Sequence, residues 1–480
     1  MKKAVLLLLL LPATLACAQA PAACGCARNL AETRRLLATN YAGYRDKVTP
    51  ATRPRLDSLA AALAARADTT RTGAACEQVL RQYLGFFRDG HLQLSSAAGG
   101  KTNADSIRAR YAGSPRLPWT RATFRAYLDD AARPKQPLEG IWRGGNGSSY
   151  EVGIVADGPG RYQGFVLQAD SVYWVPGQVK FTMADPAAGP VPATYYLRNH
   201  VAETTPARVL GEGRLDVYGP WYRHYPRPVP APAPVARHSF QMLDDTTALF
   251  RIASFDASYR RTIDSLTRAN AASLAHTRLL IVDVRGNGGG SDGSYRSLLP
   301  YLYTRPVQTV GVALYSTPEN NRKYDGAQYP HMSLGEKLYY RHLRRRLGRH
   351  PGELVPPLGA GRVVHTTRRP RRQQHPEVTR VAVLQDRNCA STTEQFLLAV
   401  GQSGKTTTFG ENSGGVLDYA NMQFQLLPCQ GLRLGWATSR SFRLDRGAGI
   451  DNVGLAPAVR LDPTVPDLVA QVRAWYRQRH

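Results

Sequence analysis

Lysine is scarce in this chain of 480 residues and accounts for about nine of its 62 Lys and Arg residues. Acidic residues are also few, 36 in all, so the formal net charge of +26 comes almost entirely from arginine. Such a balance could suit nucleic acid, an anionic membrane surface or an acidic substrate. The arginines are scattered, however, and dense only in Arg341–Arg349 and Arg368–Arg372. We therefore expect the excess of arginine to reflect a biased overall composition, with the side chains exposed to solvent, and we expect no nucleic-acid partner.

Long apolar runs are also missing. Beyond the first twenty residues no eighteen consecutive residues are apolar, so we expect no stable membrane insertion. Two lysines precede the short apolar run Ala4–Leu11, and Ala16-Cys17-Ala18 offers a cleavage site, which together are typical of a signal peptide. We expect residues 1–18 to be removed and the protein to be periplasmic or secreted. Lipoprotein anchoring through Cys17 is the alternative, but Thr14 is unusual for a lipobox.

Cysteine is sparse, and an exported chain meets an oxidising compartment, so the remaining cysteines are candidates for disulfides. The Cys24-x-Cys26 pair is too close to bond internally without strain, so we expect one of the two to bridge to Cys76. No partner Cys or His lies at zinc-ligand spacing, and we expect no metal. An odd number leaves at least one thiol free. The cysteines beyond Cys17 are Cys24, Cys26, Cys76, Cys389 and Cys429.

The length predicts two or three domains, and an apolar share of 43% excludes wholesale disorder. Apolar residues recur at helical spacing up to about residue 130. Short alternating segments follow, among them Ser171-Val-Tyr-Trp. Strands then alternate with helices, the latter predicted at Ser258–Ala275 and Gly293–Tyr303 among others, which indicates an α/β layer of largely parallel strands. The predicted parts are a helical domain at 19–135, a small antiparallel β domain at 136–225, a proline-rich linker at 226–237 and a core domain at 238–480 with a polar insertion at about 318–377.

A glycine-rich segment, Asp283–Gly290, follows a predicted buried strand. Glycines let the backbone approach a ligand and point its N–H groups inward, as an oxyanion hole requires. A phosphate-binding loop is the rival interpretation, but the spacing matches neither common nucleotide motif. A tight turn without a ligand is the third possibility.

A second junction, Asp386–Glu394, places Ser391 between a predicted strand and a predicted helix. At a helix N-terminus the amide of Thr392 and the helix dipole could both stabilise an oxyanion formed at the serine. The same Ser391-x-x-Glu394 spacing is an ordinary capping box, which on this segment alone is the better explanation. Cys389 is better explained as a small core residue than as a nucleophile. A third segment, Phe87–Leu92, contains His91 at a predicted break in the helical region; a lone histidine there is usually structural.

Taken in their order along the chain, the three segments resemble those of the tail-specific (C-terminal-processing) proteases, peptidase family S41. The resemblance is most specific at Asp283–Gly290 and Asp386–Glu394, extends to Phe409–Gly415 and Asp451–Pro457, and covers about residues 240–465. It implies a ClpP/crotonase-like core and hydrolysis of peptide bonds in exported or cell-envelope polypeptides through an acyl-enzyme, without a cofactor. No PDZ-like module is evident.

One branch of that family uses a serine–lysine dyad, but the corresponding loop here, Gly414–Val416, has no lysine, and Lys405 lies too early. The branch that includes tricorn-like proteases and retinoid-binding relatives instead has a histidine ahead of the core. That resemblance implies Ser391 as nucleophile, His91 as general base and Asp451 as third member, where the branch has the longer glutamate.

The same resemblance implies an oxyanion hole made by Thr392 with Gly288 or Gly289. It also places Gly90 where a serine often precedes the histidine. Two alternatives stay open: a non-catalytic binding protein on the same fold, and a hydrolase of non-peptide esters or amides. The basic insertion joins two loops of the expected site, so we expect it to act as a lid near the cleft.

Overall fold

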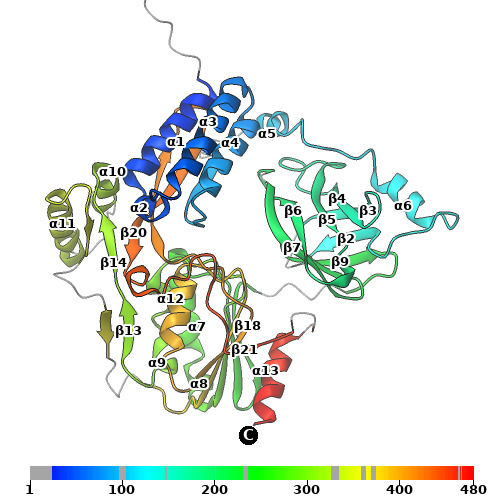
Figure 1. The fold of residues 1–480 in the computed structure, drawn as a ribbon. Coiled ribbons are helices and arrows are strands. Elements are labelled where there is room, and N and C mark those ends of the chain that lie inside the picture. Colours follow the sequence, from blue (N-terminus) through cyan, green and yellow to red (C-terminus); the bar gives the residue numbers. More distant parts are fainter. Residues whose placement is uncertain are drawn as a thin grey trace, which may run out of the picture.

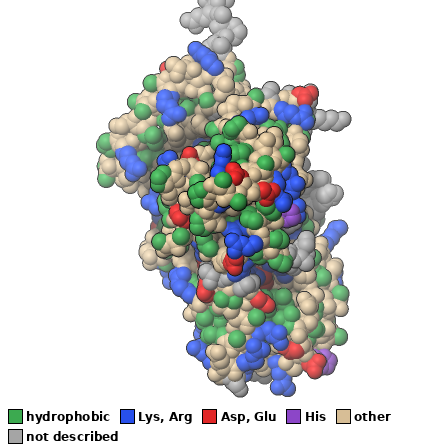
Figure 2. All heavy atoms as spheres, turned by 90° about the vertical axis from the view of Figure 1, so that its right-hand side faces the viewer, with side chains coloured by type: hydrophobic (Ala, Val, Ile, Leu, Met, Phe, Trp, Pro, Cys, Tyr) green, Lys and Arg blue, Asp and Glu red, His purple; other side chains and the backbone are tan. Residues whose placement is uncertain are grey.

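The computed structural model describes residues 24–479 except 97–103, 146–148, 201, 231–235, 326–333, 358–363, 369–373, 463–464 and 466. The predicted signal peptide, Cys17 and most of the arginine-rich segment after Thr367 lie outside these residues. Among the described helices, none is long and apolar enough to cross a membrane. Basic side chains on the face in Figure 2 spread along the molecule among acidic ones.

A six-stranded sheet forms the centre of the core, in the order β10-β11-β12-β17-β18-β21. Every neighbouring pair except β10 and β11 is parallel, so β11, β12, β17 and β18 end at the same edge of the sheet. The inner strands are nearly continuous runs of buried aliphatic residues, as a sheet covered on both faces requires. The strands are β10 (His238–Asp244), β11 (Thr247–Ile252), β12 (Leu279–Asp283), β17 (Arg380–Gln385), β18 (Thr406–Gly410) and β21 (Val459–Arg460).

Helices cover both faces of this sheet (Figure 1). One face packs against four of them, with Ile263 and Phe396 among the buried contacts. The C-terminal helix α13 (Leu468–Arg477) covers the opposite face through Val472 and Tyr476. The four helices of the first face are α7 (Arg260–Ala269), α8 (Ala271–His276), α9 (Leu299–Leu302) and α12 (Thr392–Val400).

The N-terminal helices pack on a second sheet that consists mainly of later strands. Its order is β1-β20-β14-β15, with β19 also paired to β20. Trp436 on β20 and Leu37 on α1 lie in the shared core, and β20 runs from beneath these helices toward the core domain (Figure 1). The elements are α1 (Cys26–Asn40), α2 (Tyr44–Lys47), α3 (Arg53–Thr69), α4 (Gly73–Gly85), β1 (Gln93–Ser96), β14 (Val312–Tyr315), β15 (Leu354–Val355), β19 (Tyr419–Leu426) and β20 (Leu432–Ser441).

Two disulfides join this N-terminal unit. Cys26 on α1 bonds Cys76 on α4, so the expected bridge to Cys76 is present. Cys24 bonds Cys429, a pairing of residues 405 positions apart that the sequence did not indicate. Cys389 is the free cysteine among the described residues and is buried.

The β domain is a closed barrel of strands β2 to β9. Two helices, α5 (Ala104–Arg110) and α6 (Arg121–Asp129), precede it, and its interior is filled by large side chains such as Trp142, Phe181 and Trp221. The strands are β2 (Gly140–Gly144), β3 (Glu151–Ala156), β4 (Arg161–Gln168), β5 (Val179–Ala184), β6 (Val191–Tyr196), β7 (Ala202–Gly211), β8 (Arg214–Val217) and β9 (Pro220–Tyr225).

The insertion has secondary structure of its own. A short helix, α10 (Pro318–Asn321), and a 3-10 turn, η4 (Arg322–Tyr324), are followed by α11 (Leu334–Gly348). Beside these lies a two-stranded sheet of β13 (Val307–Val310) and β16 (Val364–Thr367). Arg341–Arg349 therefore falls mainly on one amphipathic helix, whose Leu343 and Leu347 are buried against Tyr324.

Three local predictions were wrong. Ser171–Trp174 is a turn rather than a strand, because Asp170 Oδ1 accepts hydrogen bonds from the N–H groups of residues 172, 173 and 174. The helix predicted over Ser258–Ala275 breaks at Asn270, whose side chain bonds the Leu266 carbonyl. The predicted Gly293–Tyr303 helix is only a 3-10 turn (Asp292–Tyr295) followed by α9.

Candidate active site

Ser391 lies at the carboxyl edge of the core sheet, in the turn that joins β17 to α12. Its backbone has φ 56°, a left-handed conformation that is rare outside glycine and is often held at functional sites. Neighbouring loops fix the turn: Asp386 Oδ1 accepts the Gly286 N–H, and the Ala390 N–H donates to the Asn287 carbonyl. The serine is thus presented on a sharp, supported turn at the start of a helix.

Glu394 binds this turn to the next loop. Its side chain is fully buried, and the carboxylate accepts the Ser391 N–H as the acidic half of a capping box does. The Glu394 N–H donates to the Ser391 carbonyl oxygen at 2.9 Å. The capping prediction therefore holds for the carboxylate, while the serine hydroxyl faces another partner. The donors to Glu394 are Ser391 N, Ser413 Oγ, Gly415 N and Val416 N.

That partner is His91. Its Nε2 lies 3.2 Å from Ser391 Oγ, although the residues are 300 positions apart. The histidine lies in the loop between α4 and β1, and β1 pairs with β20, so the second sheet carries the loop to the core. Asn452 Nδ2 also donates to the Arg88 carbonyl of this loop. Burial lowers the pKa of the His91 imidazole, which favours the neutral form that a general base requires.

The charges of two carboxylates act on the histidine, first that of Asp89 and then that of Glu394. Asp89 accepts the His91 N–H on Oδ1 at 2.8 Å and the Tyr41 hydroxyl on Oδ2 at 2.6 Å. Its charge raises the pKa of His91, which partly offsets burial, and the backbone of Tyr419 acts in the same direction. Burial raises the pKa of the Asp89 carboxyl itself. His91 Nδ1 is buried, and no hydrogen bond of good geometry reaches it in the described part of the chain.

Asp451, the predicted third member, is not joined to the histidine. Its Oδ1 accepts the N–H groups of Leu417 and Asp418, and its Oδ2 has no partner among the described residues. Burial raises the pKa of this carboxyl to about 7, and the nearby Asp89 charge adds to the rise. The carboxylate most directly coupled to His91 is therefore Asp89. Sequence reasoning missed this role, although Asp89 stands only two residues before His91.

The three N–H groups predicted to form the oxyanion hole differ in whether they already donate a hydrogen bond within the protein. The Gly289 N–H donates to Asn287 Oδ1 at 3.0 Å and so is already used. The N–H groups of Gly288 and Thr392 have no protein acceptor within the described ranges. Gly289 instead serves close packing: it has φ 102°, and a Cβ there would lie 2.7 Å from the Ala390 carbonyl oxygen. Gly288 and Thr392 remain the donors that could meet an oxyanion.

The serine–lysine alternative has no support in the geometry. Lys405 donates to the carbonyl groups of His375 and Val378, away from the serine. A Cβ at Gly90 would lie 2.6 Å from Val416 Cγ1, so the residue that precedes His91 is small because the loop after Ser413 packs on it. Cys389 is fully buried, and burial raises the pKa of its thiol well above the ordinary value, which excludes it as a thiolate nucleophile.

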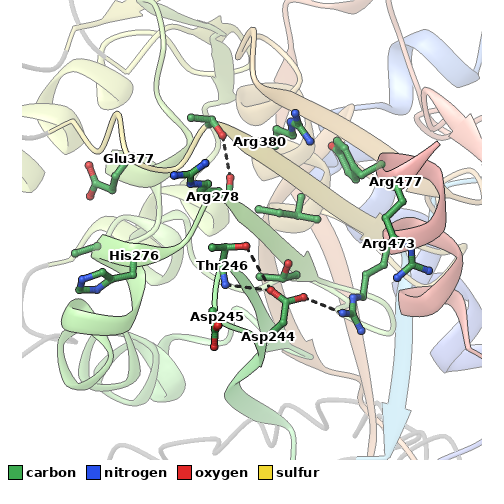
Figure 3. A pocket seen from close by; sticks show the side chains of 14 residues that line it. Asp244, Asp245, Thr246, His276, Arg278, Glu377, Arg380, Arg473 and Arg477 are labelled. Carbon is green, nitrogen blue, oxygen red and sulfur yellow. Dashed lines mark hydrogen bonds and ion pairs between the residues drawn. The ribbon is translucent and has the colours of Figure 1, made fainter. Parts of the chain in front are cut away.

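Ser391 and His91 open into a cleft of about 730 Å³. The insertion contributes Lys323, Pro357 and His365 to its walls. A larger cavity, of about 1050 Å³, lies at the opposite, amino ends of β11, β12 and β17 and contains neither residue (Figure 3). Parallel α/β sheets present their active sites at the carboxyl ends, so the smaller cleft is the candidate active site. Among the described residues no cluster of three or more His, Cys, Asp or Glu could hold a metal ion.

Ion pairs tie the β barrel to the two loops that form the site. Arg208 on β7 binds Glu411 through both terminal nitrogens, at 2.7 and 3.0 Å, and Asp216 through Nε at 3.0 Å. Asp216 in turn accepts Arg387 at 3.1 Å. Glu411 lies in the loop of Ser413 and Arg387 lies in the nucleophile turn. The barrel therefore contacts both the turn that carries Ser391 and the loop of Ser413.

Several solved structures are similar to this chain in fold at low sequence identity. Mature CPAF complexed with lactacystin has a TM-score of 0.50 and 12% identity, over 94% of this chain and 98% of that one. The photosystem II D1 C-terminal processing protease has a TM-score of 0.38 and 14% identity, over 93% and 96% of the two chains. The tricorn protease has a TM-score of 0.41 and 11% identity, over 95% of this chain and 37% of that one. No curated protein sequence matches.

The family comparison is more specific. The model named "Peptidase family S41" matches residues 246–461, the segment that holds the glycine-rich loop, the Ser391 turn and the loop of Ser413. His91 lies outside the match, and neither the branch within the family nor a ClpP/crotonase-like core is tested by it. Residues 246–461 therefore match peptidase family S41, the tail-specific proteases, and the chain is a serine-type peptidase.

Proposed function

We propose that the protein is an exported serine endopeptidase that hydrolyses peptide bonds of cell-envelope or secreted polypeptides, with His91 and Ser391 as its catalytic pair. The observation that carries the proposal is the 3.2 Å contact between His91 Nε2 and Ser391 Oγ. Hydrogen-bond reach between a buried neutral imidazole and a hydroxyl on a strained turn is the arrangement that activates a serine. The absence of a lysine from Gly414–Val416 leaves His91 as the base, as in the tricorn-like branch.

The chemistry follows from that pair. Ser391 Oγ attacks the scissile carbonyl while His91 Nε2 takes the hydroxyl proton, and the oxyanion meets the N–H groups of Thr392 and Gly288. The imidazolium returns the proton to the leaving amine, and an acyl-enzyme remains on Ser391. Water, deprotonated by His91, then releases the acid and restores the serine. The Asp89 charge stabilises the imidazolium during both steps.

Export is supported by two observations. Two disulfides connect four of the five cysteines beyond the predicted signal peptide, and disulfides persist in oxidising compartments. The first residues have the composition of a signal peptide. Periplasmic or secreted polypeptides are therefore the substrates that the enzyme would meet.

Covalent labelling tests the proposal. A fluorophosphonate probe should label the protein at Ser391, found by peptide mass spectrometry, and Ser391→Ala should abolish the label. Ser265→Ala, which removes an exposed hydroxyl on α7, is the matched control and should label as the parent does. Labelling that survives Ser391→Ala would contradict the assignment, and no labelling at all would favour a non-catalytic binding protein. Paired peptide and ester substrates then separate a peptidase from an esterase.

A further inference from the structure

The walls of the active-site cleft carry more positive than negative charge. Arg296, Lys323 and Arg443 line it, against Asp292 as the acidic side chain among its described walls. Cations in a substrate cleft attract a carboxylate only where no carboxylate of the protein already neutralises them. The partners of each cation therefore decide what the cleft can bind.

Two of these cations have acidic neighbours. Arg443 is almost fully buried, with its Nε 3.5 Å from Asp418 Oδ1, and it also donates to the Leu417 carbonyl. Arg296 lies near enough to Asp292 for its charge to lower the pKa of that carboxyl, against the opposing effect of burial. The charge of Arg443 is therefore compensated by an ion pair, and that of Arg296 is partly offset by Asp292.

Lys323 differs from both. It lies half-buried in η4, and its Nζ donates one hydrogen bond, to the Met422 carbonyl on β19 at 3.1 Å. No carboxylate pairs with it in the described part of the chain. An ammonium has three donors and is costly to bury without a counter-charge. Burial lowers the pKa of Lys323 to about 8, so the ammonium form still dominates at neutral pH.

The segment that carries Lys323 is held firmly. Asn320, three residues earlier, donates to the carbonyl groups of Asn40 and Tyr315, and accepts the Trp436 indole N–H. These contacts attach the start of the insertion to α1, β14 and β20. The ammonium is thus positioned in advance, as selective recognition requires.

We propose that Lys323 binds a carboxylate of the peptide substrate in the active-site cleft and makes the enzyme select substrates that carry one near the scissile bond. The carboxylate belongs to an Asp or Glu side chain or to the C-terminus of the substrate, since both present the same group. This inference rests on the proposed function. It also gives the start of the insertion, predicted as a lid, a role in specificity.

Paired substrates test it. Quenched fluorescent peptides with Glu or Gln at each position around the scissile bond measure preference for an acidic side chain, and peptides ending in a free carboxylate or an amide measure preference for the C-terminus. We expect the wild type to favour the carboxylate member of one series by about tenfold in kcat/KM, the usual effect of one charge-assisted hydrogen bond. Lys323→Met should bring that ratio close to one, and Lys323→Glu should reverse it toward peptides with Lys at the same position.

The control is Lys135→Met, which removes an ammonium that bonds two backbone carbonyls far from the cleft and should leave the ratio unchanged. A purely structural Lys323 would lower cleavage of both members of each pair equally. A wild type that cleaves peptides without carboxylate preference, or a preference that survives Lys323→Met, would overturn the inference while the peptidase assignment stands. A wild type that cleaves no peptide would overturn both.

Discussion

The Asp89 carboxylate joins the Tyr41 hydroxyl to the backbone N–H of His91, at 2.6 and 2.8 Å. Its charge, rather than a hydrogen bond to the ring, acts on the imidazole. Asp89 thus couples the residue that follows α1 to the catalytic loop, and it is the carboxylate whose removal should alter the pKa of the base.

Asp89→Asn keeps a hydrogen-bond acceptor but removes the charge. Since Asp89 raises the pKa of His91, the substitution should lower it further and move the acid limb of the pH–kcat/KM profile to lower pH. The imidazolium of the transition state also loses stabilisation, so kcat/KM on the plateau should fall about tenfold, at the lower end of general-base effects. Tyr41→Phe, which keeps the carboxylate, should leave the limb nearer its original position. A profile unchanged by Asp89→Asn would contradict the coupling.

Asp451→Asn separates stability from catalysis. The folded-state pKa of about 7 lies above the ordinary 3.8, so this carboxyl favours the folded state below pH 3.8, and that contribution is lost as pH rises through about 7. The asparagine keeps an acceptor for Leu417 and Asp418 without the buried charge. Thermal unfolding should therefore show Asp451→Asn gaining stability relative to the wild type between pH 4 and pH 8.

The Asp451→Asn variant also tests whether Asp451 is the third member of the catalytic site. Because no hydrogen bond joins Asp451 to His91, kcat/KM should fall less than in Asp89→Asn. A larger fall would restore Asp451 to the role that the family resemblance implied.

Glu394→Gln should destabilise the protein. Each carboxylate oxygen of this fully buried side chain accepts two hydrogen bonds, at least one of them from a backbone N–H, so an amide would place its NH₂ group against a backbone donor whichever way it turned. The expected loss is about 2–3 kcal/mol in the free energy of unfolding, measured by urea denaturation. Glu212→Gln on the exposed barrel surface is the control and should change it by less than about 0.5 kcal/mol. Equal effects of the two substitutions would contradict the role of Glu394.

Arg208→Met should loosen the barrel from the catalytic loops. The lost contacts are part-buried and bidentate, so kcat/KM should fall several-fold, and hydrogen exchange of the loop around Glu411 should increase. Arg227→Met removes an exposed ion pair with Glu212 at 3.8 Å and should have little effect. If the catalytic loops exchange as slowly in Arg208→Met as in the wild type, the barrel does not support the site.

The sequence could predict the parts of the molecule that local patterns specify. Buried runs such as Leu279–Val284 correspond to strands, and the glycine-rich loop and the Ser391 turn lie at the expected strand ends. The meeting of His91 with Ser391 followed only from family resemblance, because no local pattern relates residues 300 positions apart. The closed barrel, the Cys24–Cys429 bridge and the pairing of β1 with β20 all depend on long-range register, which alternation within one segment cannot specify.

Some details of the candidate site could not be predicted from the sequence for a similar reason. Gly289 is a sensible oxyanion donor by position, but its N–H is used by the side chain of Asn287, two residues away. The resemblance to one branch of the family predicts Asp451 as the third member, but its hydrogen bonds go to the backbone of the neighbouring loop. Such competition between partners depends on the folded geometry of several loops together.

The central claim is that His91 activates Ser391, and the rate at which a fluorophosphonate modifies Ser391 measures that activation directly. We predict that His91→Ala lowers the second-order rate constant by at least about a hundredfold at neutral pH, as loss of a general base does, whereas His276→Ala on the far side of the core leaves it unchanged. Modification of Ser391 in His91→Ala at the wild-type rate would contradict the account.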